Sequence, residues 1–374
     1  MTLDESPPIP WKVRARTAYA RTKRWHNVIL FVVGFLVDVV TLNRIDSWLD
    51  LAFQLGYLVG LTFLIVGQHR VASGLWHPRG LVEWGWKWNV EVLHFSYGGL
   101  LSNYVVFYAK SATGSRPLVF FLLLVALLLF NEMPAIRRIG HRLRLGLYAF
   151  CVASFMIYFV PVLIGKMGDW VFAVSISSAV VIVWTVVFWL ARGAAPEARR
   201  RSRWTLAWPA MAVLAGLSLL YAFRLVPPVP LSVKFQGVYQ DVEKTDQGYV
   251  LRAEEPPWWL FWRKDSRPFH FRPGDKVFYF VRVFAPSGFQ HRIAFRWEEA
   301  DPQTGRYLTR TRTPMDISGG RDQGFRAFCS FSSLSPGDWR ASVETEDGRA
   351  VGRLRFLVVA DRGKGSRRWV ESKM

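Results

Sequence analysis

Long apolar segments fill the first 230 residues of the chain, and short alternating segments follow them. Runs such as LVFFLLLVALLLF (118–130) and AVVIVWTVVFWLA (179–191) are typical of membrane-spanning helices, which need about 20 mostly apolar residues. From residue 231 onward no apolar run is longer than a strand. The change falls at the proline-rich stretch LVPPVP (225–230), so the pattern predicts a helical membrane domain followed by a soluble domain.

The apolar runs predict about seven membrane-spanning helices. They cover 26–43, 48–67, 90–109, 117–133, 144–164, 170–191 and 205–226. Of the Lys and Arg residues between them, 17 fall at the amino terminus and in 68–89, 134–143 and 192–204, against four elsewhere (Arg44, Lys110, Arg116 and Lys166). Because Lys and Arg in short loops favour the cytoplasmic side, the amino terminus is expected inside and the carboxy-terminal domain outside the cytoplasm.

The predicted organisation has four parts. They are a basic cytoplasmic amino terminus (1–25), a helical transmembrane domain (26–230), an extracytoplasmic β-sandwich domain (231–362) and a basic flexible tail (363–374). No cleavable signal peptide is expected, because no small-residue cleavage site follows the first apolar run.

The net charge of +20 does not indicate nucleic-acid binding. In residues 1–230 the positive excess sits in short loops between apolar runs, which is the pattern of membrane topology rather than of a phosphate-binding stripe. No disulfide is expected, because Cys151 lies in an apolar run and Cys329 in a predicted strand.

Polar residues inside predicted spans cost free energy and are therefore candidates for function. The candidates are Asp38, Gln54, Glu91, His94, Asn103, Asn131 and Glu132. Alternatively, Asp38 lies near a helix end, and Glu91, Asn131 and Glu132 lie near the cytoplasmic interface, where they snorkel or pair with arginines. Five of the seven histidines fall near the same interface, but none has HxxxH spacing, so no cofactor or metal is expected.

Short alternating segments separated by turn signals predict an all-β fold after residue 231. DWRASVET (338–345) and GRLRFLVV (352–359) alternate apolar and polar residues around the turn EDG (346–348). Six more strands are predicted at 234–243, 248–253, 276–284, 291–299, 306–313 and 324–331. This number and spacing of strands favour an immunoglobulin-like β-sandwich, without the Cys–Trp–Cys spacing of true immunoglobulin domains.

Two parts of the chain resemble uncharacterised bacterial membrane proteins. The stretch FSYGGLLSNYVVFYAKSATGSRP followed by LLLFNE resembles the membrane region of that family. The tail PSGFQHRIAFRWEE…GFRAFCSFSSLSPGDWRASVETEDGRAVGRLRF resembles its carboxy-terminal domain of unknown function 2914. The resemblance implies a membrane-anchored sandwich in the cell envelope and no particular activity.

The segment EEPPWWLFWRKD (254–265) is the strongest candidate for a binding surface. Its two prolines end a strand, and the residues singled out are Trp258, Trp259, Phe261, Trp262, Arg263 and Lys264. Three interpretations stay open. The rings pack on the sandwich as core or rim, they enter the outer leaflet beside anionic headgroups, or they form a stacking platform for a sugar strand.

The soluble domain has few groups for catalysis. Glu298 and Glu299 are adjacent in a strand and therefore point to opposite faces, and no GxSxG, HExxH or phosphate-loop motif is present. The residues therefore favour a non-enzymatic function.

We expect a multi-pass protein of a bacterial inner membrane that presents a periplasmic binding or scaffold domain in envelope assembly or sensing. Its expected partners are the lipid bilayer and an envelope protein, lipid or glycan. The alternative is a transporter or membrane-embedded enzyme, with Asp38, Glu91, His94, Asn103, Asn131 and Glu132 lining an internal polar site and the sandwich as accessory.

Overall fold

A computed structural model describes most of the chain. The described residues are 33, 35–40, 42, 45–133, 140–193, 197–246, 248–321, 323–361 and 367–374. The part from Ile45 to Met374 forms one compact unit. The predicted amino-terminal domain (1–25) and most of the predicted span 26–43 lie outside the described residues.

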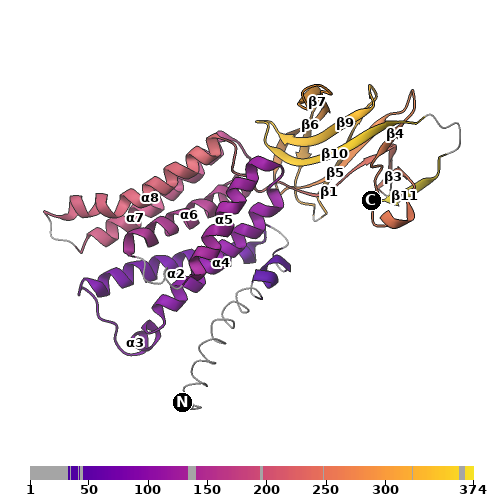
Figure 1. Cartoon of the computed structure of the whole chain (residues 1–374). Coiled ribbons are helices and arrows are strands. Elements are labelled where there is room, and N and C mark those ends of the chain that lie inside the picture. Colours follow the sequence, from indigo (N-terminus) through magenta and orange to yellow (C-terminus); the bar gives the residue numbers. More distant parts are fainter. Residues whose placement is uncertain are drawn as a thin grey trace, which may run out of the picture. The chain divides into compact units, whose positions relative to one another are not determined.

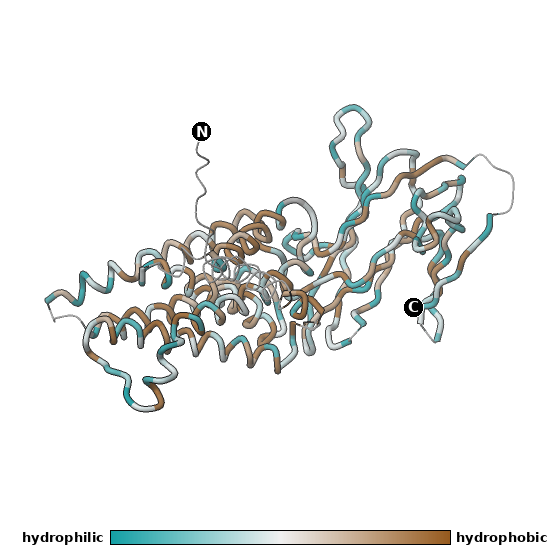
Figure 2. The backbone as a smooth tube through the Cα atoms, turned by 60° about the horizontal axis from the view of Figure 1, so that its bottom comes forward, coloured by the Kyte–Doolittle hydropathy of each residue, from teal (hydrophilic) through white to brown (hydrophobic). Residues whose placement is uncertain are grey.

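Each predicted span from residue 48 onward corresponds to a helix. The long helices are α2 (Trp48–Ala72), α4 (Asn89–Ser111), α5 (Ser115–Glu132), α6 (His141–Ile164), α7 (Asp169–Ala191) and α8 (Arg199–Ala222), with a short helix α3 (Leu81–Trp86) between the first two (Figure 1). Four of them, α2, α6, α7 and α8, are long and apolar enough to cross a membrane. Figure 2 shows hydrophobic residues concentrated along the helices.

Tyrosines on one face of α4 attach that helix to α6. The hydroxyls of Tyr97, Tyr104 and Tyr108 donate hydrogen bonds of 2.9, 2.9 and 3.0 Å to the backbone carbonyls of Arg144, Cys151 and Ser154. The seven- and four-residue spacing of the tyrosines keeps them on the same face of a 3.6-residue helix. All three rings are fully buried, so each apolar ring fills the interface while its hydroxyl finds an acceptor.

The carboxy-terminal region is β-rich, and its described strands form three sheets. Its strands are β1 (Ser232–Tyr239), β2 (Asp241–Thr245), β3 (Gly248–Glu254), β4 (Phe269–Phe271), β5 (Val277–Phe284), β6 (Gln290–Ala300), β7 (Tyr307–Ser318), β8 (Phe325–Phe331), β9 (Gly337–Thr345), β10 (Ala350–Ala360) and β11 (Trp369–Lys373). The strand orders are β1-β5-β8, β4-β10-β9-β6-β7 and β11-β3-β2. Neighbouring strands are antiparallel, except for the parallel pair β4 and β10.

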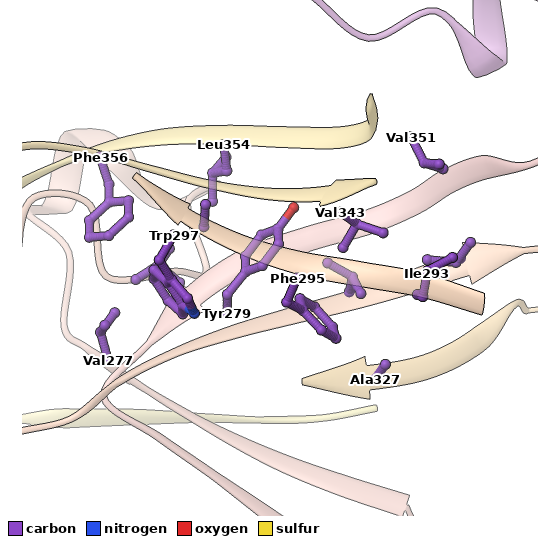
Figure 3. Packing of buried hydrophobic residues seen from close by; sticks show 14 of the residues in the cluster. Val277, Tyr279, Ile293, Phe295, Trp297, Ala327, Val343, Val351, Leu354 and Phe356 are labelled. Atoms are coloured by element: carbon purple, nitrogen blue, oxygen red, sulfur yellow. The ribbon is translucent and has the colours of Figure 1, made fainter. Parts of the chain in front are cut away.

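The larger hydrophobic core lies between the three-stranded sheet β1-β5-β8 and the five-stranded sheet. Tyr279 of β5 packs against Phe295 and Trp297 of β6, with ring centroids 5.9 and 6.2 Å apart. Figure 3 shows these side chains together between the strands. Trp297 and Trp339 are the largest fully buried side chains of this core.

A second, smaller core covers the other face of β5. Phe280 contacts Tyr239 and Tyr249 there, together with Leu251 of β3. Strand β5 is therefore buried on both faces, which explains its continuous apolar sequence VFYFVRVF. An immunoglobulin-like sandwich has two sheets, whereas the described strands form three, so the immunoglobulin-like prediction is not confirmed.

The end of the chain differs from the predicted flexible tail. Residues 369–373 form β11, which pairs with β3 from Trp369 opposite Glu254 to Lys373 opposite Val250. The sequence WVESK is short and follows a basic, Gly-containing stretch, so it carries only a weak strand signal by itself. Its pairing depends on the free edge of β3, which lies more than 100 residues earlier in the chain.

One end of the helical bundle contacts the β-rich region. Asp46, just before α2, accepts a 3.1 Å hydrogen bond from the backbone of Ser287. Thr113 of the α4–α5 loop donates one of 2.8 Å to the carbonyl of Val351, and Gly165 after α6 accepts one from Gln290. The loops that the charge pattern assigns to one side of the membrane thus meet at the same domain.

Candidate functional site

The aromatic segment after β3 projects its rings into solvent. Pro256 and Pro257 end the strand, and a single 3₁₀ turn (Trp258–Leu260) follows. The exposed fractions are 83% for Trp258, 55% for Trp259, 79% for Phe261 and 63% for Trp262. These four side chains are named the aromatic loop below. Their exposure contradicts a position in the core, whereas the interpretation as part of the rim of the sandwich stays open.

The rings of the aromatic loop form two edge-to-face pairs. The centroids of Trp258 and Trp259 are 5.7 Å apart, and those of Phe261 and Trp262 are 5.0 Å apart. Both pairs are close to perpendicular, which is a favourable aromatic geometry. Exposed apolar clusters of this kind mark binding surfaces, because their exposure to water costs free energy in the unbound state.

The base of the aromatic loop is held by hydrogen bonds. The backbone of Ser266 donates to the carbonyl of Val238 at 2.7 Å, and the Ser266 hydroxyl accepts from the backbone of Glu254 at 3.2 Å. Arg263 donates to the carbonyl of Arg267 at 2.6 Å, while Lys264 is exposed. Asp265 and Ser266 are buried, so the rings are presented from a fixed base.

Strand register places the aromatic loop at the end of the β-rich region remote from the helices. The helices are contacted near the start of β10, at Val351. The strand that follows the loop, β4, pairs with β10 at Val358–Ala360. Seven residues of strand separate the two ends, a distance of about 23 Å at 3.3 Å per residue. The base of the aromatic loop therefore lies away from the bundle, which disfavours insertion of the loop into a bilayer around the helices.

A cleft lies where the hairpin between β9 and β10 meets the bundle. It has a volume of about 280 Å³. Its apolar wall comes from the ends of α6, α7 and α8 and the segment after α8. Its polar wall includes His291, Glu346, Asp347 and Arg349.

Arg349 fills the centre of this junction and joins the hairpin to α7 and α8. Its guanidinium lies 3.6 Å from the ring centroid of Tyr221, and that ring stacks on Phe172. The Tyr221 hydroxyl donates a 3.0 Å hydrogen bond to Asp169, which also lies 3.9 Å from Arg349. Nε of Arg349 is 2.7 Å from Asp347, although out of hydrogen-bond alignment. Because its side chain is only 7% exposed, Arg349 has a structural role: it connects the hairpin to the helices and is not accessible to a ligand.

His291 lines the same cleft. Burial lowers the pKa of its imidazole, and the carboxylates of Asp347 and Glu346 oppose that shift. The residue sits in β6 opposite Ile317. A neutral imidazole is therefore favoured in the folded protein at neutral pH.

The predicted polar residues of the spans do not form one site. His94 and Asn131 are brought together: His94 Nδ1 lies 3.2 Å from Asn131 Oδ1, and the Asn131 amide donates to the His94 carbonyl at 3.1 Å. Glu132 lies beside them, near Gly98.

The other predicted polar residues lie apart from this group. Glu91 is exposed, one helical turn before His94. Asn103 is buried nine residues further along α4, about 13 Å at 1.5 Å per residue. Asp38 belongs to the other compact unit.

Gln54, the remaining polar candidate of the spans, is fully buried and hydrogen-bonds the Tyr158 hydroxyl. Sequence reasoning missed further polar contacts in the bundle, such as the 2.6 Å hydrogen bond between Thr62 and Tyr148. Arg144 donates to Gln68 at 2.6 Å, and Gln68 donates to Asn89 at 2.6 Å. Gln68, Asn89 and Arg144 lie at predicted span ends, where polar residues are ordinary, so only the fold identifies them as one chain of contacts.

The acidic pair of the β-rich region is structural. Glu298 forms two hydrogen bonds with Arg340, of 2.6 and 2.7 Å. Glu299 pairs instead with Arg310 and with the hydroxyl of Ser335. The two carboxylates thus have separate partners, as their alternation predicts. Within the described ranges, no group of three His, Cys, Asp or Glu side chains could hold a metal ion.

The class defined by these features is a helical protein with membrane-compatible helices and a β-rich carboxy-terminal domain. Residues 290–358, from β6 to β10, match the family model "Protein of unknown function (DUF2914)". The carboxy-terminal region therefore contains a DUF2914 domain, as the resemblance of its sequence predicted. The match includes the hairpin that carries Arg349 and stops short of the bundle and the aromatic loop.

Other comparisons add little. No curated protein has significant sequence similarity to the chain. Among solved structures, Pseudomonas fluorescens alkylpurine DNA glycosylase AlkC bound to DNA containing an abasic site analog is 10% identical, with 81% of this chain and 97% of that chain covered. The TM-score is 0.20, which is too low to indicate a common fold.

Proposed function

We propose that the protein is a multi-pass protein of a bacterial inner membrane that presents a periplasmic, non-enzymatic binding domain. In this proposal the bundle crosses the membrane seven times, with the first crossing at 26–43. The sheets around the larger core act as an immunoglobulin-like sandwich. The third sheet, β11-β3-β2, is an addition that supports the aromatic loop.

The observation that carries the proposal is the exposure of four aromatic side chains on a hydrogen-bonded base. Trp is enriched among the residues that dominate protein–protein binding energies. The rings are also exposed and their base is remote from the helices, which favours insertion into a pocket of another envelope protein. Lipid and glycan partners are the competing outcomes of the test.

Photo-crosslinking in cells tests this function. A photoreactive residue replaces Trp259 in the full-length protein, and the matched control carries it at Leu308, an exposed position of β7. The expected result is a discrete adduct with an envelope protein from position 259 and none from 308. A lipid or glycan adduct would change the partner class, and equal labelling from both positions would contradict a specific surface.

The contacts of His94 favour a second candidate, a transporter or membrane-embedded enzyme. His94, Asn131 and Glu132 meet between α4 and α5, and polar groups within a bundle mark functional sites by default. In this case His94→Ala abolishes function at an unchanged protein level, whereas Trp259→Ala has no effect. The binding proposal expects the reverse.

A further inference from the structure

One row of the five-stranded sheet brings together three polar side chains on the face turned away from the core. In β9, the side chains of Trp339, Ala341 and Val343 face the core. Ser342 lies between two of them in the strand and therefore points to the opposite face. Ser342 is paired with Arg296 of β6 on one side and with Arg353 of β10 on the other. Directly opposed residues of neighbouring strands share a face, with Cβ atoms about 5 Å apart.

This row presents buried donors without acceptors. Ser342 is fully buried and its hydroxyl has no hydrogen-bond partner among the described residues. The same holds for Nε of Arg296 and Nε of Arg353, both of which are shielded from solvent. Buried donors are normally satisfied, because an unmade hydrogen bond costs about 1–3 kcal/mol. Two guanidinium groups and a hydroxyl together match the acceptor-rich oxygens of an oxyanion.

The neighbouring carboxylates are already engaged. Glu344 accepts a 2.9 Å hydrogen bond from Nη1 of Arg296. Glu298 is held by Arg340, and it lies 4.0 Å from Nε of Arg296, too far for a hydrogen bond. Among the described residues, Arg353 has no carboxylate within 4.0 Å.

The surroundings of Arg353 leave its positive charge poorly compensated. Burial lowers the pKa of its guanidinium, and the charges of Arg340 and Arg296 lower it further, against the opposing effect of Glu298 and Glu344. Arg312 and Arg355 extend the same face. A bound anion would compensate this excess of positive charge.

Arg353 also lies next to the bundle. A Cβ added at Gly114, in the α4–α5 loop, would come within 2.9 Å of Nη1 of Arg353. Lys110 and Arg116 flank this loop at the ends of α4 and α5. Arg353, at one end of the donor row, therefore lies beside helix ends that, in the proposed topology, are at the level of lipid headgroups.

We propose that Arg296, Ser342 and Arg353 bind a phosphate group, supplied by the headgroup of an anionic membrane phospholipid. The lipid source rests on the membrane placement in the proposed function, whereas the oxyanion chemistry rests only on the row of donors. A bound headgroup would fix the DUF2914 domain against the membrane surface beside the α4–α5 loop.

Lipid retention in the full-length protein tests the proposal. The protein is extracted from nanodiscs that contain phosphatidylethanolamine with a minor share of phosphatidylglycerol, and the retained lipids are counted by native mass spectrometry. We expect one retained phosphatidylglycerol, with retention reduced about tenfold or more in Arg353→Gln, since charged hydrogen bonds to phosphate are lost. Arg292→Gln is the matched control, because Arg292 is an exposed arginine of β6 paired with Asp316.

A second arm separates the two sources of phosphate. Lipid-free protein in detergent is titrated with inorganic phosphate and followed by ³¹P line broadening. If Arg353→Gln removes the phosphate broadening but the wild type retains no phosphatidylglycerol selectively, the oxyanion site is supported. In that case the proposal that a lipid supplies the phosphate is wrong. If Arg353→Gln fails to fold, Ser342→Ala replaces it in both measurements, because alanine adds no bulk at this buried position. The same losses of phosphate broadening and of lipid retention are expected.

Retention that is equal in the wild type, Arg353→Gln and Ser342→Ala, together with no phosphate broadening, would overturn the site. Crosslinking from position 259 in the Arg353→Gln background is the independent readout. It is expected to persist, so failure of the phosphate site and failure of the aromatic binding surface remain distinguishable.

Discussion

At the scale of single residues, the junction between bundle and DUF2914 domain depends on a few contacts. Arg349 is held by the ring of Tyr221, by Asp347 and by Asp169. The stacked ring and the carboxylates constrain the guanidinium from several directions. The contact with the ring depends on the planar guanidinium, whereas the ion pairs depend only on the charge, so lysine would replace the charge but not the stacking.

Arg349→Ala is expected to loosen the β9–β10 hairpin from the bundle by about 2 kcal/mol, because a desolvated cation–π contact and an ion pair are lost. Hydrogen exchange at the amides of residues 346–352 in the full-length protein measures this, and Arg349→Lys should fall in between. Arg355→Ala, at an exposed site of the same strand, is the control, and equal exchange in both alanine variants would refute the role of Arg349.

His291 predicts a pH dependence of stability. Its pKa is lowered in the folded state by burial, so the unfolded chain binds more protons between that lowered value and about 6.5, the unfolded value. Stability is therefore fully present above about pH 6.5 and falls as the pH drops below it.

The thermal unfolding midpoint should decrease between about pH 7.5 and pH 5.5, and this decrease should be smaller in His291→Gln. Glutamine keeps hydrogen-bonding capacity without titrating in this range. If the variant has the same pH dependence as the wild type, His291 is not the titrating group.

At the scale of elements, the sequence predicts local structure well and pairing poorly. The apolar runs locate the helices α2 and α4 to α8, and the alternation in DWRASVET and GRLRFLVV locates β9 and β10. The third sheet was not predicted, because it depends on the contact of Tyr249 and Leu251 with the second face of β5. Strand β11 was missed for the same reason, since its partner β3 is far away in the sequence.

The same limit applies to the candidate sites. The aromatic loop is visible in the sequence, because its rings and prolines are adjacent in the chain. The donor row of Arg296, Ser342 and Arg353 exists only through strand register. The Arg349 junction likewise combines a hairpin with helices more than 100 residues away, so neither could be read from the sequence.

Strand β11 is expected to stabilise the base of the aromatic loop. Removal of residues 369–374 exposes Leu251 and Ala253 at the edge of β3 and deletes several ladder hydrogen bonds, each contributing about 0.5–1.5 kcal/mol. Hydrogen exchange in β3 should accelerate, and crosslinking from position 259 should weaken. Glu371→Gln, which removes only the contact with Arg252, is the control, and an unchanged exchange rate after truncation would contradict the prediction.

At the scale of the whole molecule, charge and contacts support one orientation. The loops rich in Arg and Lys lie at one set of helix ends, and the loops that touch the DUF2914 domain lie at the other. Positive loops favour the cytoplasm. The domain and its aromatic loop are therefore expected on the opposite side of the membrane, the side of the proposed envelope partner.

Thiol labelling in intact spheroplasts tests this central claim most directly. A single cysteine replaces Trp259 in a background in which Cys151 and Cys329 are changed to serine, and a membrane-impermeant maleimide is added from outside. The account predicts rapid labelling at position 259, and labelling of Arg79→Cys, in the loop after α2, only after lysis. Labelling of position 79 in intact spheroplasts, with position 259 protected until lysis, would contradict the account.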